Sequence, residues 1–164
     1  ITNSPTEEIS KKIYMIFDSP PQFEYINTKV FLKSVLGDNY KEDKIKELID
    51  LLGLPKDLLN RGVNYKLSAG EKKKFEIMLM LLKNPDVILL DEIDSGLDTD
   101  SIILVRNVLK KEKEKNKIIV AITHVGKIFQ DFQPDYVYIM KEGRMKQAYL
   151  NILKRIIEYG YSNI

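Results

Sequence analysis

Three short segments in the middle of the chain constrain its fold more than any other feature. They are Leu67–Glu71, Val87–Glu92 and Ser95–Asp98, in that order. The second begins with four consecutive apolar residues, a pattern typical of a parallel strand that is covered on both faces. The first has the residues of a helix start and the third those of a turn, so the strand is predicted to lie between helices. The sequence therefore predicts an α/β fold with a mostly parallel sheet flanked by helices.

The apolar periodicity places further elements on either side of these segments. Asn27 or Thr28 is suited to cap a helix and Gly53 to end a second one, so residues 27–60 are predicted to be helical without a strand. After residue 67, strands and helices alternate, as they do in a parallel sheet with helices packed on it. The predicted strands are 12–17, 87–90, 117–123 and 136–140, and the later helices are 70–83, 98–114, 127–132 and 149–159.

Composition narrows the possible functions. A length of 164 residues suffices for one well-packed domain. Lys and Arg total 26 against 24 Asp and Glu, and this balance gives no reason to expect nucleic acid or an anionic membrane as the main partner. The absence of cysteine excludes disulfides and cysteine-ligated zinc. The longest apolar run, 77–82, is too short to span a bilayer, so no membrane insertion is expected.

Two carboxylates, Asp91 and Glu92, follow the apolar strand at its carboxyl end, where open α/β sheets place their ligand sites. Asp91 is suited to hold Mg²⁺, because a hard cation prefers oxygen ligands, and Glu92 to act on a water as a general base. Adjacent residues on an extended strand face opposite ways, so the two are not expected to share one task. The simpler interpretation is that both acids cap the strand in solvent.

A helix start at Ser68, Ala69 and Gly70 offers a seat for an anion. Free backbone N–H groups, the Ser68 hydroxyl and a glycine that permits close approach all favour a phosphate there. The alternative is an ordinary cap, in which Ser68 and Glu71 form a capping box, and both interpretations use the same geometry. Of the lysines at positions 72–74, two are expected only to extend along the surface toward solvent.

His124, the only histidine, follows the predicted strand 117–123. A lone histidine is usually a structural or surface residue, but this one is expected at the same sheet edge as Glu92. An imidazole there can hydrogen-bond a terminal phosphate and help to position a water. The segment Ser95–Asp98 also has two interpretations, a turn with a helix cap or a segment that crosses to a partner subunit.

Taken together, these residues resemble the motifs of the ABC-type ATPases. The signature loop (67–71), the Walker B strand (87–92), the D-loop (95–98) and the switch histidine (His124) occur in that family's order and spacing. The closest resemblance is to SufC, the ATPase subunit of the SUF iron–sulfur cluster assembly system. The stretches that carry it are Glu71–Lys74, Asp91–Asp98, Gln133–Val137 and Glu158–Tyr161.

The resemblance implies ATP and Mg²⁺ as cofactors and a dimer that closes on two ATP molecules. In it, Asp91 binds Mg²⁺, Glu92 activates water and His124 senses the γ-phosphate. The residues implied to contact the partner's nucleotide are Ser68, Ala69, Gly70, Glu71 and Asp98. The implied domain organisation is a single ABC domain with a core strand and Q-loop region (1–26), a helical subdomain (27–66), and an α/β core with a C-terminal helix (67–164).

The resemblance also implies partners and a compartment. A SUF-type ATPase acts on scaffold proteins resembling SufB and SufD, and here they are expected to dock on the loop Asp18–Ile26 and the helix Thr28–Leu36. The implied location is the cytoplasm or an organelle stroma. The alternatives are the ATPase subunit of a membrane transporter, which shares the catalytic residues, and an inactive interaction module.

Three departures from the family pattern qualify these expectations. No Gly-x-x-x-x-Gly-Lys-[Ser/Thr] phosphate loop (Walker A) occurs in these residues, so the chain is expected to be an N-terminally truncated part of an ATPase and inactive alone. Asp18 occupies the position of the Q-loop glutamine, so either Asp18, through a water, or Gln22, after a shift of the loop, is expected to serve Mg²⁺. Ala69 replaces a glycine of the signature and adds one methyl group near the phosphate.

Overall fold

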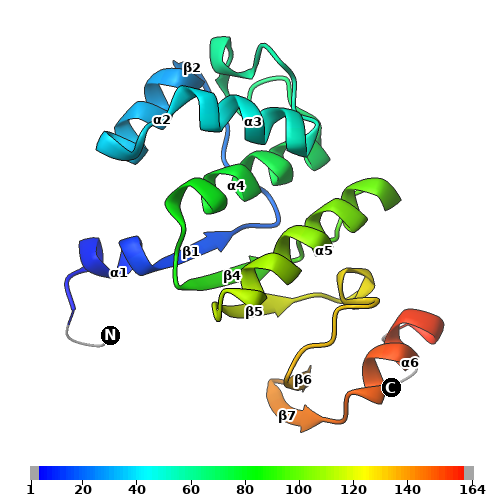
Figure 1. Cartoon of the computed structure of the whole chain (residues 1–164). Helices are drawn as coiled ribbons and strands as arrows, with labels where there is room; N and C mark the ends of the chain where they lie inside the picture. Colours follow the sequence, from blue (N-terminus) through cyan, green and yellow to red (C-terminus); the bar gives the residue numbers. More distant parts are fainter. Residues whose placement is uncertain (1–3, 161–164) are drawn as a thin grey trace.

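The computed structural model describes residues 4–160 and contains the predicted parallel sheet. Its strands are β1 (Ile13–Ile16), β4 (Val87–Asp91) and β5 (Ile118–Ile122), in the order β1-β4-β5. β1 runs parallel to β4 and β4 parallel to β5, so the three carboxyl ends lie at one edge (Figure 1). The prediction of an α/β fold is confirmed.

Two helices cover one face of this sheet, α4 (Ala69–Lys83) and α5 (Thr99–Glu114) (Figure 1). The strand side chains that face them, such as Ile16 and Ile88, are fully buried in one core cluster with Phe75 of α4. From Phe75 to Met80 every side chain of α4 is buried, as its nearly all-round apolar sequence predicts. This burial holds the start of α4 close to the carboxyl edge of the sheet.

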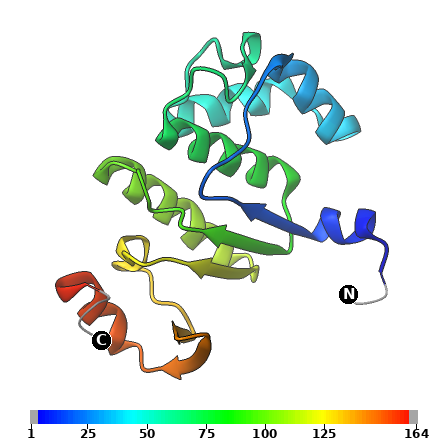
Figure 2. The same cartoon turned by 180° about the vertical axis from the view of Figure 1, so that it is seen from behind.

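The opposite face of the sheet is open. Side chains alternate along a strand, so the neighbours of the buried residues point away from α4 and α5. Met15 of β1 is 38% exposed, and Ile118, Val120 and Ile122 of β5 are 60%, 51% and 63% exposed. Seen from behind, no helix of residues 4–160 covers this side (Figure 2). Parallel sheets are normally covered on both faces, whereas in residues 4–160 the apolar side chains of this face stay exposed.

Residues 27–60 contain the predicted helices, and one element is added to them. Asn27 caps α2 (Thr28–Leu36) by accepting hydrogen bonds from two backbone N–H groups, and Gly53 ends α3 (Glu42–Leu52) in a left-handed conformation. Short 3₁₀ turns follow each helix, η1 (Gly37–Asn39) and η2 (Leu58–Asn60).

The addition is a small antiparallel pair that frames this subdomain, β2 (Phe23–Asn27) with β3 (Gly62–Val63). The pair was not predicted. Every residue of β2 is exposed, and apolar and polar residues do not alternate regularly along the strand. Gly62 is required there, since a Cβ at this position would lie 2.2 Å from the backbone oxygen of Glu24. The pair therefore fixes the loop after β1 against the helices.

The C-terminal part differs from the predicted alternation. The helix expected at 127–132 is only a 3₁₀ turn, η3 (Lys127–Phe129), and β6 (Val137–Lys141) pairs antiparallel with β7 (Arg144–Ala148) in a separate hairpin. Helix α6 (Asn151–Tyr159) follows, next to the loop at Gly126, and Tyr161 of the SufC-like tail lies outside the described residues.

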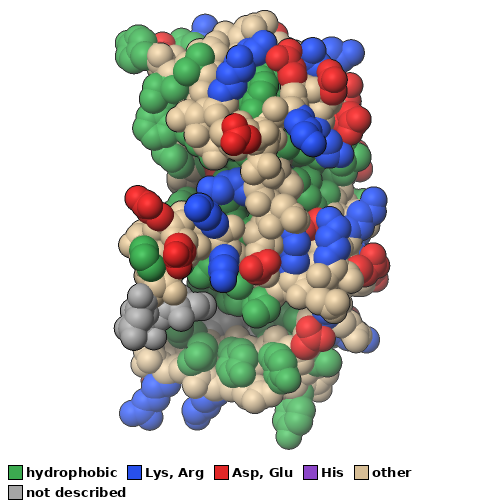
Figure 3. All heavy atoms as spheres, turned by 60° about the vertical axis from the view of Figure 1, so that its left-hand side comes forward, with side chains coloured by type: hydrophobic (Ala, Val, Ile, Leu, Met, Phe, Trp, Pro, Cys, Tyr) green, Lys and Arg blue, Asp and Glu red, His purple; other side chains and the backbone are tan. Residues whose placement is uncertain are grey.

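A helix near the N-terminal end and the distribution of side chains on the surface complete the description. At the other end of the chain, a helix α1 (Thr6–Lys12) precedes β1 and was not predicted. Figure 3 shows charged side chains of both signs interleaved over the middle of one face, whereas hydrophobic side chains gather in its lower part, at the level of the β6–β7 hairpin. Exposed apolar residues of that hairpin include Tyr138, Met140 and Met145.

Candidate nucleotide site

The candidate site lies at the carboxyl edge of the parallel sheet. Because β1, β4 and β5 all end there, the residues that follow them converge. Asp18 comes after β1, Glu92 after β4 and His124 after β5. The structure brings these three predicted residues into one cluster with a fourth, Lys73 of α4, which the sequence interpretation had not singled out.

Glu92 and His124 form the first contact of this cluster. The Oε1 atom of Glu92 lies 3.1 Å from Nδ1 of His124, and both side chains are partly exposed to solvent. Nδ1–H must be the donor, so in a neutral imidazole Nε2 carries the lone pair and cannot donate. A hydrogen bond from His124 Nε2 to a phosphate then requires either the imidazolium or release of Glu92.

The backbone corrects one premise of the prediction. Asp91 is the last residue of β4, and Glu92 lies beyond it in the left-handed region with φ 46°. The two carboxylates are thus separated by a change of backbone conformation and not by the alternation of an extended strand. The Glu92 N–H still donates to the Ile122 backbone oxygen at 2.9 Å, which keeps the residue at the sheet edge.

Lys73 connects the loops after β1 and β4. Its side chain is buried, and Nζ donates to the backbone oxygens of Glu92 and Ser95, at 2.6 and 2.7 Å, and to Oδ1 of Asp18, at 3.1 Å. The hydrogen bond and charge of Lys73 lower the pKa of Asp18 below its ordinary value. A signal for this lysine exists in the sequence, since positions 73, 77 and 80 form one face of α4 and the other two are buried apolar residues.

A second buried contact joins the loops after β4 and β5. Asp94 is buried and accepts hydrogen bonds from the hydroxyl of Thr123, at 2.8 Å to Oδ1 and 3.0 Å to Oδ2. The same hydroxyl accepts from the backbone N–H groups of Val125 and Gly126. This arrangement fixes the turn that carries His124. The sequence interpretation gave Asp94 no role of its own, because its partner Thr123 lies 29 residues away in the sequence and nothing local indicates the contact.

The signature segment adopts the predicted capping box. The Ser68 hydroxyl accepts from the Glu71 N–H at 3.2 Å, and a Glu71 carboxylate oxygen accepts from the Ser68 N–H at 2.7 Å. Ser68 and Ala69 are exposed, so the helix start is accessible to a ligand. A Cβ placed on Gly70 would meet the Leu97 side chain at 3.5 Å, which shows that the signature and D-loop segments lie side by side.

Asp98 caps α5, since its Oδ1 accepts from the Ser101 N–H at 2.7 Å and this bond lowers the pKa of Asp98. The cap interpretation of Ser95–Asp98 is thereby confirmed. Within residues 4–160, the carboxylate of Asp91 and the amide of Gln22 make no hydrogen bond or ion pair, and Gln22 is exposed. The donor chemistry of Asp91 fits Mg²⁺, but no group of three metal-ligating side chains occurs in the described part of the chain.

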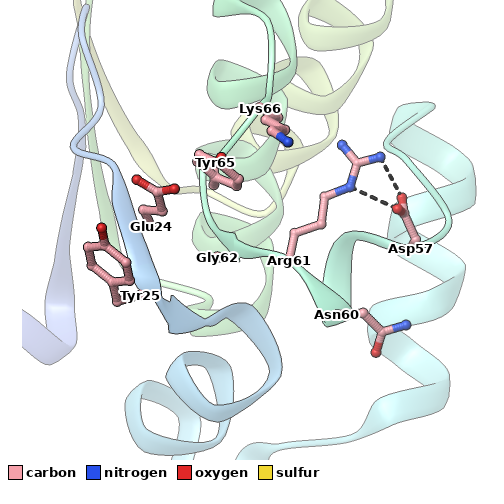
Figure 4. Close-up of a pocket in the computed structure, with 8 residues that line it drawn as sticks. All are labelled: Glu24, Tyr25, Asp57, Asn60, Arg61, Gly62, Tyr65 and Lys66. Carbon is pink, nitrogen blue, oxygen red and sulfur yellow. Dashed lines mark hydrogen bonds and ion pairs between the residues drawn. The ribbon is translucent and has the colours of Figure 1, made fainter.

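A hollow of about 590 Å³ lies elsewhere, in the helical subdomain (Figure 4). Arg61 crosses its wall and pairs with Asp57 through two hydrogen bonds, of 2.8 and 2.9 Å. Glu24 and Tyr25 of β2 lie on the opposite side in the same view. This hollow contains none of the predicted nucleotide-binding residues, so it is separate from the candidate site.

Comparison with known proteins decides the family. A family described as "ABC transporter" matches residues 1–95 of the chain. The "Probable ATP-dependent transporter SufC" of Escherichia coli is 32% identical over 96% of this chain and 69% of its own length. The chain belongs to the ABC transporter family. The prediction from its motifs is therefore confirmed at the level of the family.

Other relatives agree with this assignment. The "Iron-sulfur cluster assembly protein SufC" of Plasmodium berghei is 32% identical over 92% of this chain, which spans only 45% of that protein. The ycf16 protein of Cyanophora paradoxa, a "Probable ATP-dependent transporter", is 30% identical over 96% of this chain and 66% of its own length. No helix among residues 4–160 is both long and apolar enough to cross a membrane.

Solved structures support the fold alone. An ATP-binding cassette determined as a dimer in a post-hydrolysis state with ADP and Pi superposes with a TM-score of 0.69 at 21% identity, over 88% of this chain and 68% of that one. A bacterial Atm1-family ABC exporter with ATP bound gives 0.73 at 19% identity, over 94% of this chain and 28% of that one.

Proposed function

We propose that the protein is the ATP-binding and ATP-hydrolysing subunit of a SUF-type iron–sulfur cluster assembly complex. The observation that carries the proposal is the contact of Glu92 with His124 at the carboxyl edge of the sheet, 3.1 Å between Oε1 and Nδ1. A carboxylate beside an imidazole at this edge is an arrangement suited to ATP hydrolysis. The similarity to SufC proteins supports the cluster-assembly context.

Each predicted residue then has a task. In this proposal Glu92 accepts a proton from the attacking water, and His124 orients that carboxylate and binds the terminal phosphate once Glu92 is released. Asp91 is the residue to hold Mg²⁺, which when bound offsets negative charge on the phosphate oxygens. In an ATP-dependent homodimer, the exposed start of α4 at Ser68 and Ala69, with Gly70, Glu71 and Asp98 beside it, contacts the nucleotide of the other subunit.

The phosphate-binding loop has to come from outside these 164 residues, because no such motif occurs in them. The open apolar face of the sheet offers a place for the polypeptide that carries it. Its exposed isoleucines on β5 and the unpaired edge of that strand can accept a further strand and a helix. This packing would bring a phosphate loop to the edge where Glu92 and His124 lie.

The partner surface is proposed on β2 and α2, where SufB- and SufD-like scaffolds would dock. Tyr25 is 94% exposed, and Phe23, Ile26 and Val30 are further exposed apolar side chains of these two elements. An apolar patch rimmed by polar residues is typical of a protein-binding site. Such an ATPase would work in the cytoplasm or in an organelle stroma, the compartments in which the scaffold pair is expected.

One experiment separates this proposal from a transporter ATPase, which the word "transporter" in the name of the E. coli relative favours. The tagged protein is isolated from its own cells, and the co-isolated proteins are identified with and without Tyr25→Asp. SufB- and SufD-like proteins that are lost in Tyr25→Asp support the proposal, whereas a membrane permease in their place supports the transporter. Tyr149→Asp, at an exposed tyrosine after β7, is the matched control.

A further inference from the structure

We propose that Asp18 is the counterion of buried Lys73 and that the pair acts as a clamp on the turn from Glu92 to Ser95. The residue that corresponds to a glutamine in the resembled family would thus serve to position Glu92, in addition to or in place of a Mg²⁺ contact. The structural part of this proposal stands on the contacts alone, and only its effect on ATP hydrolysis rests on the proposed function.

In the clamp, all three N–H donors of the Lys73 ammonium have an acceptor. An ammonium has three N–H donors, and Nζ has three acceptors within 3.1 Å, namely Asp18 Oδ1 and the backbone oxygens of Glu92 and Ser95. Only 2% of the residue is exposed. A charge that is removed from water in this way requires a partner of opposite charge, and Asp18 is the carboxylate bound to it.

The two backbone acceptors are the two ends of one turn. The Ser95 N–H donates to the Glu92 oxygen at 3.0 Å, and Glu92 itself has a left-handed backbone with φ 46°, which a residue other than glycine rarely adopts. Lys73 therefore binds the carbonyl groups at both ends of a turn that is intrinsically unfavourable. Without the ammonium, both carbonyls would lose a charge-assisted hydrogen bond and the turn would open more often.

Asp18 meets this requirement better than an amide would. An amide at position 18 accepts one hydrogen bond from Lys73 but supplies no charge. The Asp18 carboxylate is held in place by the hydroxyl of Ser19, which donates to Oδ2 at 3.2 Å. The other carboxylate nearby, that of Glu92, is already in contact with His124. The pair therefore joins the loop after β1 to the loop after β4 and fixes the direction of the Glu92 side chain.

The test is amide hydrogen exchange of the protein, read at the Ser95 N–H. Lys73→Met keeps the length of the side chain and removes the charge, and we expect exchange at Ser95 to accelerate by about tenfold or more. For Asp18→Asn we expect about threefold to tenfold, whereas Asp18→Glu keeps the charge and should stay within about twofold. Lys72→Met, one residue away on α4, is the matched control, and the Leu90 N–H in the sheet reports any general loss of stability.

Each outcome decides the proposal. Faster exchange at Ser95 in Lys73→Met and Asp18→Asn, with rescue in Asp18→Glu and an unchanged Leu90, supports the clamp. Unchanged exchange in Asp18→Asn overturns it, even if Lys73→Met does not fold, because Asp18 is partly exposed and its substitution leaves the core intact. Equal effects of Asp18→Asn and Asp18→Glu also overturn it.

Activity gives a separate reading. In the ATP-hydrolysing assembly, Asp18→Asn should lower kcat severalfold and leave KM nearly unchanged, with recovery in Asp18→Glu, because Glu92 would be misdirected while nucleotide binding is retained. A rise in KM alone would contradict the positioning role. An assembly without ATP hydrolysis in any variant would instead refute the proposed function and leave the exchange result standing.

Discussion

The two faces of the parallel sheet provide a sharp prediction, because each carries an isoleucine that can be shortened in the same way. Ile88 of β4 is fully buried under α4 and α5, and Ile118 of β5 is 60% exposed on the open face. Truncation of a buried isoleucine to alanine costs about 2–5 kcal/mol, from lost transfer free energy and the remaining cavity. We expect Ile88→Ala to lower the free energy of unfolding by about 3–4 kcal/mol.

Ile118→Ala should cost far less. A side chain that is 60% exposed has lost less than half of its accessible surface, and truncation leaves no enclosed cavity. Full burial of such a side chain contributes about 1.5–3 kcal/mol, so the expected cost is about 1 kcal/mol or below. Urea unfolding of both variants and of the parent protein, fitted with a common m-value, measures the difference.

Equal destabilisation by the two variants would refute the description of one covered and one open face. The same measurement extends to the assembly. If further polypeptide packs on the open face, Ile118→Ala should weaken its binding while leaving the isolated protein nearly as stable as the parent.

Three other predictions follow from single contacts. Hydrogen bonds from Lys29 of α2 and then from Lys46 lower the pKa of Glu42 to about 2. Glu42→Gln should therefore be less stable than the parent at neutral pH, and the difference should disappear as the pH falls below 4.5 toward 2. A difference in thermal unfolding that does not depend on pH would contradict this. Gly62→Ala should cost about 1–3 kcal/mol because its Cβ would overlap the Glu24 backbone, whereas Gly70→Ala, with ordinary contacts, should leave the urea midpoint nearly unchanged. Calorimetric titration of these 164 residues with Mg-ATP should show no saturable binding, since they contain no phosphate loop, and saturable binding would mean that another segment replaces it.

Local chemistry explains which parts of the fold were predictable. Asn27 and Ser68 cap helices, and Gly53 ends one, through contacts made within a few residues, so their positions in the sequence suffice. The apolar run of β4 likewise predicts a parallel strand, although residues 4–160 cover only one of its two faces. By contrast, β2 is held by Gly62 from a distant segment and has no buried residue, so nothing in its own sequence indicates a strand.

The sequence predicts which residues form most of the candidate site, but not the contacts that join them. Asp91, Glu92 and His124 were identified because they follow apolar strands, and parallel strands end at one edge. The left-handed backbone of Glu92 could not be predicted, since neither glycine nor asparagine marks it. Lys73 was overlooked because a lysine among lysines is usually a surface residue, although its helical spacing from Ile77 and Met80 indicates burial.

The most direct test of the account is the rate of Mg-ATP hydrolysis by the assembly isolated from its own cells, with Glu92 or with Glu92→Gln. Loss of a general base should lower kcat by about 100-fold or more, while Glu114→Gln, at an exposed glutamate of α5, should leave it unchanged. That result would support Glu92 as the residue that activates water. Turnover of the Glu92→Gln assembly at the parent rate would contradict the central claim that the cluster at the sheet edge is the hydrolytic site.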